Sequence, residues 1–361
     1  MLTHKNLIYD ALATFTIVNL GTEDRMVSML PLSHAYECTL GLVAPLMKGS
    51  AVYYLDKPPT ARVLLPALQK IKPTVLLTVP LVIEKIYKNR ILPTFKKKLL
   101  LRGLTKIPVI RKRLYKAAGR KLLASFGNEL RSYCIGGAAL CPEVELFLRE
   151  AGFPYAIGYG LTETAPLISG TGPENTAYRA AGKPLAGVEM RIDHPNPKTG
   201  EGEILVRGPV VMKGYFQDAK RTEEVLDKDG WFRTGDLGVF DKQGYLYIKG
   251  RSKNMILGPN GENIYPEEIE ATLNEMEEVV ESLVYLRDGK LTAKVCLNYE
   301  VLDSRFSAQK LNPDRIEALL EELRNIVNQN VSSFSRINKI LEQPEPFEKT
   351  PTQKIKRYLY V

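Results

Sequence analysis

Strand and helix signals alternate over the first half of the chain, and this alternation limits the folds that it can adopt. The run TVLLTV (74–79) is short, apolar and rich in β-branched residues, as a buried strand requires, and the helical pattern LVIEKIYK follows it. RSYCI (131–135) repeats the arrangement, because it runs into Gly136-Gly137 and then into the helical PEVELFLREA. We therefore predict an α/β region with a parallel sheet and helical crossovers over residues 1–185.

The pattern changes after residue 185. EILVRG (203–208) and YLYIKG (245–250) are short alternating strands with Gly and Asp turns between them. They predict a small antiparallel, β-barrel-like subdomain over residues 186–252. A helix that begins at Pro266, strands near 279–287 and 292–299 and a helix near 312–328 predict a small α+β domain over residues 253–361.

Composition excludes several classes of protein. Hydrophobic residues make up 44% of the 361 residues and charged residues 25%, values that are ordinary for a globular protein. No stretch reaches the roughly 18 consecutive apolar residues that a membrane-spanning helix needs. The start MLTHKNLIYD lacks the features of a signal peptide, so we expect a cytoplasmic location. The four cysteines show no CxxC spacing and the three histidines form no metal motif, which argues against a disulfide scaffold or a zinc site.

The net charge of +9 is concentrated in one segment. Residues 96–121 read KKKLLLRGLTKIPVIRKRLYKAAGRK and contain no acid. One interpretation is a solvated helical face near an acidic neighbour. A second is peripheral contact with anionic lipid on the inner face of a membrane, where each basic residue contributes on the order of 1 kcal/mol. Nucleic acid is a weaker third interpretation, because no recognition motif accompanies the charge.

The segment Gly158-Tyr159-Gly160-Leu161-Thr162-Glu163-Thr164 combines residue types that suit a nucleotide. Its glycines allow close approach of the backbone to a ligand, and Tyr159 offers an aromatic face to a base. The Thr162 hydroxyl could bind phosphate, and the Glu163 carboxylate could bind Mg²⁺, which prefers oxygen ligands. By itself GYG is a common turn, and a turn without any function explains an isolated GYG better than a nucleotide site does, so the context decides.

Three further segments supply that context. Ile135-Gly136-Gly137-Ala138-Ala139 follows a predicted strand, where open α/β sheets bind ligands. Asp236 lies between glycines in WFRTGDLG, and its carboxylate could accept both hydroxyls of a ribose. KGRSK provides Arg251, a fixed cation that suits phosphate or ribose oxygens. Their occurrence together, in this order, favours a nucleotide site.

The ordered motifs LPLSHAYE, IGGAAL, GYGLTET, GEILVRG, WFRTGDLG, KGRSKNMI and TPTQKIKR resemble those of the acyl-adenylate-forming superfamily. That superfamily includes acyl-CoA synthetases, firefly luciferase and the adenylation domains of peptide synthetases. The resemblance extends from residue 1 to residue 361. The basic segment and GPNGENIYPEEIE look most like long-chain fatty acyl-CoA synthetases.

The resemblance implies roles for individual residues. Thr162 would bind the α-phosphate, Glu163 would hold Mg²⁺, and Asp236 would bind the ribose hydroxyls with help from Arg251. Gly136, Gly137 and Ala138 would line the adenine pocket. Tyr159, which stands between Gly158 and Gly160 in the sequence, would stack on the adenine ring. ATP or AMP, Mg²⁺ and coenzyme A are the cofactors and substrates implied, together with a fatty acid.

The resemblance also implies roles in the last third of the chain. Lys253 matches a hinge between a large and a small domain, and Gly261 matches the glycine beside which the thiol of coenzyme A arrives. Lys354 matches the catalytic lysine of a carboxyl-terminal loop. The family usually has glycine before that lysine, whereas this chain has Gln353, a bulkier residue that could restrict the loop.

His34 could be a base, a ligand or a satisfied polar residue near the core. Fatty carboxylates are already ionised at neutral pH, so their adenylation needs no base. We therefore interpret His34 as a residue that shapes the acyl-binding face, as in the family.

The implied reaction is ATP-dependent formation of acyl-AMP, followed by transfer of the acyl group to coenzyme A. Two alternatives stay open: an acyl–acyl-carrier-protein ligase, because the thiol acceptor is only indirectly encoded, and a non-catalytic fragment that binds acyl-adenylate.

The family has a phosphate loop that ends in Pro-Lys-Gly directly before a segment like MLTHKNL, where this sequence starts. GTGPENT (170–176) lacks the lysine and the serine run of such a loop. We therefore expect a gene fragment, a shortened polypeptide or a chain completed by another one. The 361 residues by themselves are expected to form little acyl-AMP from ATP.

Overall fold

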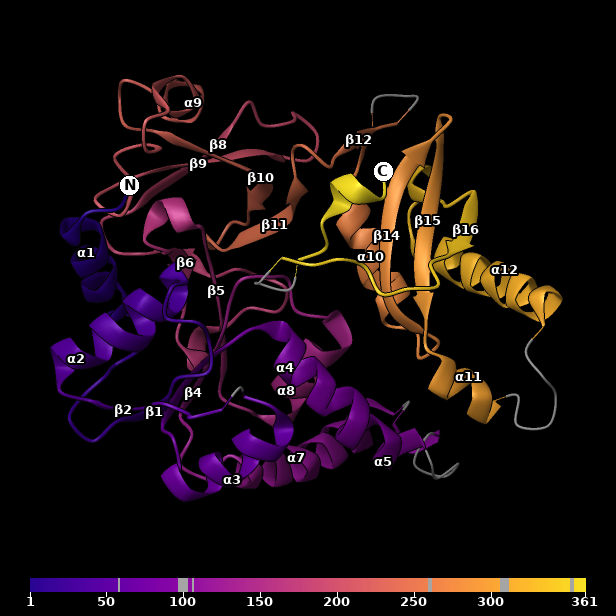
Figure 1. The fold of residues 1–361 in the computed structure, drawn as a ribbon, viewed down its shortest axis with the longest axis horizontal. Coiled ribbons are helices and arrows are strands. Elements are labelled where there is room, and N and C mark those ends of the chain that lie inside the picture. Colours follow the sequence, from indigo (N-terminus) through magenta and orange to yellow (C-terminus); the bar gives the residue numbers. More distant parts are fainter. Residues whose placement is uncertain (58, 97–102, 106, 259–261, 306–311, 351–353) are drawn as a thin grey trace. The chain divides into compact units, whose positions relative to one another are not determined.

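The computed structural model describes residues 1–57, 59–96, 103–105, 107–258, 262–305, 312–350 and 354–361 (Figure 1). The chain divides into two compact units. The first unit consists of Met1–Thr234 and Gly238–Ile248, and the second consists of Gly235–Leu237 and Lys249–Val361. The structure confirms the predicted mixed α/β class, whereas the three-part division at residues 185 and 252 stays a prediction. None of the described helices is both long and apolar enough to cross a lipid bilayer.

The α-helices are α1 (His4–Thr14), α2 (Ala44–Lys48), α3 (Ala61–Ile71), α4 (Pro80–Ile86), α5 (Leu92–Lys96), α7 (Pro108–Ser125), α8 (Pro142–Ala151), α9 (Ala219–Val225), α10 (Pro266–Asn274), α11 (Tyr299–Arg305) and α12 (Pro313–Asn330). Two π-helices, η1 (Glu37–Val43) and η2 (Tyr87–Ile91), and four 3₁₀ turns, η3 (Thr162–Thr164), η4 (Pro173–Asn175), η5 (Ser333–Ser335) and η6 (Arg357–Leu359), complete the described helical elements.

The strands of the first unit are β1 (Arg25–Val27), β2 (Ala51–Tyr53), β3 (Val75–Thr78), β4 (Ser132–Ile135), β5 (Tyr155–Gly160), β6 (Leu167–Gly170), β7 (Lys183–Pro184), β8 (Glu189–Asp193) and β9 (Gly202–Arg207). The strands β10 (Phe232–Phe240) and β11 (Leu246–Arg251) cross the boundary between the units. The second unit contains β12 (Ile256–Leu257), β13 (Asn263–Ile264), β14 (Val279–Arg287), β15 (Lys290–Leu297) and β16 (Lys339–Glu342).

A seven-stranded sheet with the order β2-β1-β3-β4-β5-β6-β7 forms the centre of the first unit (Figure 1). The strands from β2 to β5 pair in parallel, as the alternating strand and helix signals predicted. The prediction of a parallel sheet was incomplete, because β6 and β7 join antiparallel. The reason is local, since only six residues, 161–166, separate β5 from β6, too few for a helical crossover.

Strand β3 shows why this sheet is buried on both faces. Leu76 belongs to one hydrophobic core, formed with side chains of α3, α4, α7 and α8. Its neighbours Val75 and Leu77 belong to a second core, formed with side chains of α1 and η1. Successive side chains of a strand point to opposite faces, so a continuous apolar run serves both cores.

Helix α8 has the local signals that its sequence predicted. Pro142 occupies the first turn, where its missing N–H costs nothing, and Glu143 and Glu145 lie near the positive end of the helix dipole. Gly152 ends the helix in the left-handed conformation, with φ 67°. The side chains that α8 buries are those of Val144, Glu145, Phe147, Leu148 and Ala151.

The predicted barrel-like segment contains a four-stranded sheet with the order β11-β10-β9-β8. This order has two ends, so the described strands form an open sheet. β8 and β9 pair antiparallel in register from Glu189↔Arg207 to Asp193↔Glu203. The short helix α9 between β9 and β10 was not predicted from the sequence.

The second unit contains a three-stranded sheet with the order β14-β15-β16, with α10 against β14 and α12 against β16. The buried side chains Leu273, Val284, Val295 and Leu323 belong to one core that joins these elements. The predicted helix at Pro266 and the two predicted strands are confirmed, although β15 begins two residues earlier than expected.

Candidate functional site

The carboxyl ends of β4 and β5 bring two of the sequence motifs together in the first unit. Ile135 pairs with Ile157, so Gly136 and Gly158 follow at the same edge of the sheet. Gly137 has φ 88°, a conformation that favours glycine, and it turns the chain away from the strand end. The residues predicted to line an adenine pocket therefore lie beside the residues predicted to stack on the base.

The backbone at Gly160 admits no side chain. A Cβ atom there would lie 1.8 Å from the Pro166 carbonyl oxygen, because β5 and β6 approach each other closely at this point. The Leu161 N–H donates to the same carbonyl oxygen at 3.0 Å. The glycine thus lets the loop 161–166 close tightly, and this closure places Thr162 and Glu163 just beyond the strand end.

Glu163 is held by both its backbone and its side chain. The Met212 N–H donates to the Glu163 carbonyl oxygen at 2.8 Å, and the Tyr215 hydroxyl donates to Glu163 Oε1 at 2.9 Å. Burial and this hydrogen bond raise the pKa of Tyr215 to about 12, so the phenol is a protonated donor at neutral pH. Among the described residues Glu163 Oε2 has no partner, and the Thr162 side chain is exposed.

The buried carboxyl group of Asp10 binds the backbone directly after the loop 161–166. The Leu167 N–H donates to Asp10 Oδ2 at 3.1 Å, and Asp10 is 0% exposed. Burial raises the pKa of this carboxyl from 3.8 to about 8, and its Oδ1 has no partner within the described part of the chain. Helix α1 is thereby attached to the strand that follows the loop.

His34 lies next to the glycine edge. The Tyr36 N–H donates to His34 Nδ1 at 3.2 Å. The Tyr36 ring lies 3.4 Å from the position that a Cβ on Gly136 would take, and its hydroxyl donates to the Cys134 carbonyl oxygen at 3.1 Å. This arrangement is compatible with a role for His34 in shaping a binding face, which stays a prediction.

The second unit contains the predicted ribose pair. The Arg251 Nε donates to Asp236 Oδ1 at 2.8 Å, and Asp236 is 5% exposed. The Ser252 N–H donates to the Gly235 carbonyl oxygen at 2.9 Å and holds the two segments together. A carboxylate fixed by a guanidinium can accept hydrogen bonds from a pair of hydroxyls.

The other predicted residues of the second unit are more scattered. Lys253 is exposed in the turn that follows β11, four residues after the boundary between the units at Lys249. Gly261 and Gln353 lie outside the described residues. The proposed hinge and coenzyme A contacts therefore stay predictions.

Lys354 is exposed on a hairpin near the carboxyl end of the chain. Its N–H donates to Thr350 Oγ1 at 3.2 Å, and its carbonyl oxygen accepts from the Thr350 N–H at 2.8 Å. The base of the hairpin is fastened by ion pairs of Lys349 with Glu281 and of Arg357 with Glu270, the latter at 2.6 Å. Burial raises the pKa of Glu270 to about 7, although the Arg357 charge opposes the shift.

Sequence reasoning missed several residues that support the site: Asn6, Asp10, Tyr36, Met212 and Tyr215. Met212 acts through its backbone, which no side-chain pattern reveals. For Tyr215 a signal was present, because it follows Gly214 as Tyr159 follows Gly158.

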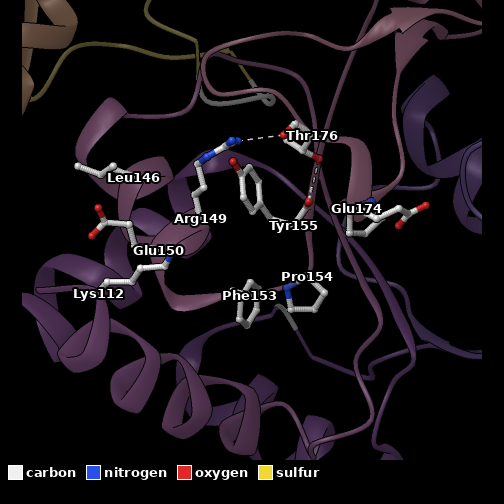
Figure 2. A pocket seen from close by; sticks show the side chains of 11 residues that line it. Lys112, Leu146, Arg149, Glu150, Phe153, Pro154, Tyr155, Glu174 and Thr176 are labelled. Atoms are coloured by element: carbon white, nitrogen blue, oxygen red, sulfur yellow. Dashed lines mark hydrogen bonds between the residues drawn. The ribbon is translucent and has the colours of Figure 1, made fainter. Parts of the chain in front are cut away.

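A pocket on the first unit lies at the opposite end of β5, beside Tyr155 (Figure 2). Two of its charged side chains have protein partners: Arg149 donates to the Thr176 carbonyl oxygen at 3.0 Å, and Glu150 pairs with Arg111 at 2.6 Å. Ligands of open α/β sheets bind at the carboxyl ends of strands, so the edge at Gly160 is the stronger candidate.

Comparison with solved structures defines the class of fold. O-succinylbenzoate coenzyme A synthetase (MenE) from Bacillus subtilis, solved with AMP, superposes with a TM-score of 0.76 at 23% identity over 99% of this chain and 65% of that one. ATP-bound MatB from Rhodopseudomonas palustris also gives a TM-score of 0.76, at 22% identity over 99% and 64% of the two chains. The chain therefore has the fold of the adenylate-forming enzymes.

The model of the family of AMP-binding enzymes matches residues 1–216, and the chain belongs to this family. Long chain acyl-CoA synthetase 6, peroxisomal, of Arabidopsis thaliana is 29% identical over 99% of this chain and 56% of its own length. Long-chain-fatty-acid–CoA ligase FadD15 of Mycobacterium bovis is 30% identical over 99% and 64%, and ligase 1 of Cavia porcellus is 31% identical over 99% and 56%. The chain thus spans between about half and two thirds of the length of these relatives.

The oxygen atoms of Glu163 and Thr162 are suitable ligands for a cation that arrives with a nucleotide. The structure contains no group of three or more His, Cys, Asp or Glu side chains that could hold a metal, as far as its residues are described. Mg²⁺ is commonly bound by one or two carboxylates together with substrate phosphates. One carboxylate with an unpartnered oxygen beside an exposed threonine hydroxyl suits that mode.

Proposed function

We propose that the chain acts in the ATP-dependent conversion of a long-chain fatty acid into its coenzyme A thioester. The observation that carries the proposal is the edge formed by Gly136 and Gly158, beside which Glu163 presents a carboxylate oxygen that has no partner among the residues the structure describes. Membership of the AMP-binding family and the names of the long-chain ligases among the relatives support it.

In the first step, an oxygen of the fatty carboxylate attacks the α-phosphorus of ATP. The bond from this phosphorus to the bridging oxygen breaks, and pyrophosphate leaves with both bonding electrons. Thr162 would bind the α-phosphate, and Glu163 would hold the Mg²⁺ that neutralises phosphate charge. The Lys354 ammonium would bridge the carboxylate and the α-phosphate oxygens, so catalysis would rest on positioning and charge.

In the second step, the coenzyme A thiolate attacks the acyl carbonyl carbon and AMP leaves. Asp236 and Arg251 would keep the ribose in place throughout, because a carboxylate fixed by a guanidinium can accept hydrogen bonds from the ribose hydroxyls. Rotation about Lys253 would remove Lys354 and bring Gly261 to the thiol, a hinge motion around a ligand.

A supplied acyl-adenylate isolates the second step. We expect the chain to bind AMP and dodecanoyl-AMP in calorimetry and to form dodecanoyl-CoA from dodecanoyl-AMP and coenzyme A, detected by mass spectrometry. Tight binding without thioester from a folded sample would contradict the ligase and favour a non-catalytic acyl-adenylate-binding module. Transfer to the holo acyl carrier protein in place of coenzyme A would favour the carrier-protein ligase.

The phosphate loop of the family does not occur within the 361 residues. We therefore expect slow or undetectable exchange of pyrophosphate into ATP by this polypeptide. Exchange at the rate of a full-length relative would contradict this expectation.

A second part of the proposal concerns the membrane from which a fatty acid comes. Helix α7 presents five exposed cations outside its buried stripe of Tyr115, Gly119 and Leu122: Lys112, Arg113, Lys116, Arg120 and Lys121. We call this set the α7 basic face. Within the described part of the chain none of the five has an ion-pair partner, whereas the half-buried Arg111 is paired with Glu150. A face of unpaired cations suits anionic lipid headgroups.

Co-sedimentation with vesicles tests this contact. We expect binding to phosphatidylglycerol-containing vesicles at low salt and none to pure phosphatidylcholine. A variant with Lys112, Lys116 and Arg120 changed to Glu should lose binding, whereas the same changes at the exposed Lys220, Lys228 and Lys242 should retain it. Equal losses of vesicle binding in the two variants would show that binding depends on the net charge of the chain and not on the α7 basic face.

A further inference from the structure

The hydrogen bond from Tyr215 to Glu163 Oε1 connects two segments that lie 52 residues apart in the first unit. We propose that Tyr215 is the positioning residue for the Glu163 carboxylate and orients its second oxygen, Oε2, toward a nucleotide-bound divalent cation. The inference rests on the proposed function, in which Glu163 binds that cation. It adds a residue, Tyr215, that the sequence motifs did not assign to the site.

The backbone around Tyr215 fixes the direction of its ring. Gly214 has φ 139°, and a Cβ there would lie 2.7 Å from Thr222 Cγ2, so the chain passes close to α9. The Tyr215 N–H donates to Thr222 Oγ1 at 2.9 Å. The Arg221 guanidinium lies 4.9 Å from the ring centroid, a distance at which a cation stabilises an aromatic face. One backbone hydrogen bond and one contact with the ring therefore hold Tyr215 in place.

The segment that carries Tyr215 also holds the backbone of Glu163. The Met212 N–H donates to the Glu163 carbonyl oxygen at 2.8 Å, three residues before Tyr215. Asn6 Nδ2 in turn donates to the carbonyl oxygens of Pro209 at 2.7 Å and Val211 at 2.9 Å. The segment 209–215 thus fixes Glu163 at its backbone and its side chain at once. This double attachment restricts the rotamers of a residue that is otherwise half exposed.

The choice of a phenol as partner has a chemical consequence. A neutral donor orients a carboxylate and leaves its negative charge intact for a cation. The carboxylate of Asp236 has the opposite kind of partner, because the Arg251 guanidinium binds it at 2.8 Å and neutralises it. A neutralised carboxylate accepts hydrogen bonds from hydroxyls but attracts a metal ion weakly. The two partners therefore distinguish the proposed cation carboxylate from the proposed ribose carboxylate.

Titration of Mn²⁺, followed by electron paramagnetic resonance in the presence of saturating ATP, tests the inference on the full chain. We expect Tyr215→Phe to raise the Kd for Mn²⁺ about tenfold, the size expected for loss of one hydrogen bond to a charged group. The affinity for metal-free ATP should be unchanged, because the ring and its packing remain. The matched control is Tyr245→Phe, which removes a hydroxyl that donates to the Asn175 carbonyl oxygen at 2.8 Å. This control should bind Mn²⁺ like the original chain.

Glu163→Gln separates failure of the inference from failure of the proposed function. Loss of Mn²⁺ affinity in Glu163→Gln with no change in Tyr215→Phe would overturn the positioning role and leave the cation site intact. An unchanged Kd in both variants, or no Mn²⁺ binding by the original chain, would overturn the cation role of Glu163 and the inference with it. A Tyr215→Phe variant that also loses metal-free ATP would show a general structural role and equally contradict the inference.

Discussion

The two loops that carry Glu163 and Lys354 are each attached to a buried carboxyl group, but the two carboxyls have different partners. Among the described residues the Asp10 carboxyl accepts only the Leu167 N–H, and burial raises its pKa to about 8. Glu270, whose side chain is 13% exposed, accepts the Val284 N–H at 2.6 Å and the Arg357 guanidinium, and its pKa is raised only to about 7. The comparison teaches that a fixed cation offsets part of the cost of burying a charge, whereas one backbone N–H leaves the group protonated at neutral pH.

The consequence for stability has the same sign in both units. Each carboxyl binds its proton more tightly in the folded chain than in the unfolded one, so unfolding releases that proton. The stabilisation is therefore complete below the unfolded pKa and is lost as pH rises through the folded pKa. The window runs from 3.8 to about 8 for Asp10 and from 4.5 to about 7 for Glu270.

The largest effect is expected for Asp10→Asn, which removes the titrating group and keeps an oxygen for the Leu167 N–H. The free energy of unfolding of the first unit should rise by on the order of 3 kcal/mol at pH 7, and its decrease between pH 4 and 8 should become shallower by the contribution of Asp10. The fluorescence of Trp231, the single tryptophan and a residue of the first unit, reports urea unfolding of that unit. An unchanged slope with pH in the variant would show that Asp10 is ionised in the folded chain.

Removal of the cation from the second carboxyl should have a somewhat smaller effect. Arg357→Met leaves Glu270 with one backbone donor. The free energy of unfolding of the second unit should therefore fall by about 3 kcal/mol or less at neutral pH. The pKa of Glu270 should rise further, which extends the pH-dependent window above 7. Hydrogen exchange of peptides from α10 and β14 measures this unit separately. The double variant Glu270→Gln with Arg357→Met is the control, because it should restore most of the stability.

Asn6→Ala probes the attachment of segment 209–215 to α1. The variant loses two hydrogen bonds to buried or half-buried carbonyl oxygens and the capping box with Thr3, so we expect a loss of about 2 kcal/mol. Urea unfolding followed by Trp231 fluorescence provides the measurement. A loss as small as that of an exposed substitution, such as Lys5→Ala, would show that the segment is held by its own packing.

The smallest effect is expected at the base of the Lys354 hairpin. Lys349→Met removes one ion pair with Glu281, whose Oε1 still accepts the Phe347 N–H at 2.9 Å. Because the lysine is partly exposed, the free energy of unfolding of the second unit should fall by less than about 1 kcal/mol. Exchange of the Phe347 and Glu348 amides should quicken slightly. Rapid exchange across the whole of β14 would instead assign this pair a global role.

Much of the secondary structure was predictable from local patterns. The apolar run at β3 and the Pro-led helix α8 have periods and end signals that operate within a few residues, and both formed where they were expected. The π-helix η1 and the antiparallel additions β6 and β7 were not predicted. Their geometry depends on packing between distant segments, and periodicity contains no information about it.

For the candidate site, too, one part was predictable from local sequence and another part was not. Sequence by itself determined which residues have the right chemistry, because motifs such as GYGLTET and WFRTGDLG place glycines, hydroxyls and carboxylates at fixed spacings. Only the tertiary structure decided their partners: Tyr215 on Glu163, Arg251 on Asp236, and Asp10 beneath the loop. The physical reason is that a carboxylate's orientation, charge and pKa depend on donors, cations and burial supplied by residues tens of positions away, which no local pattern encodes.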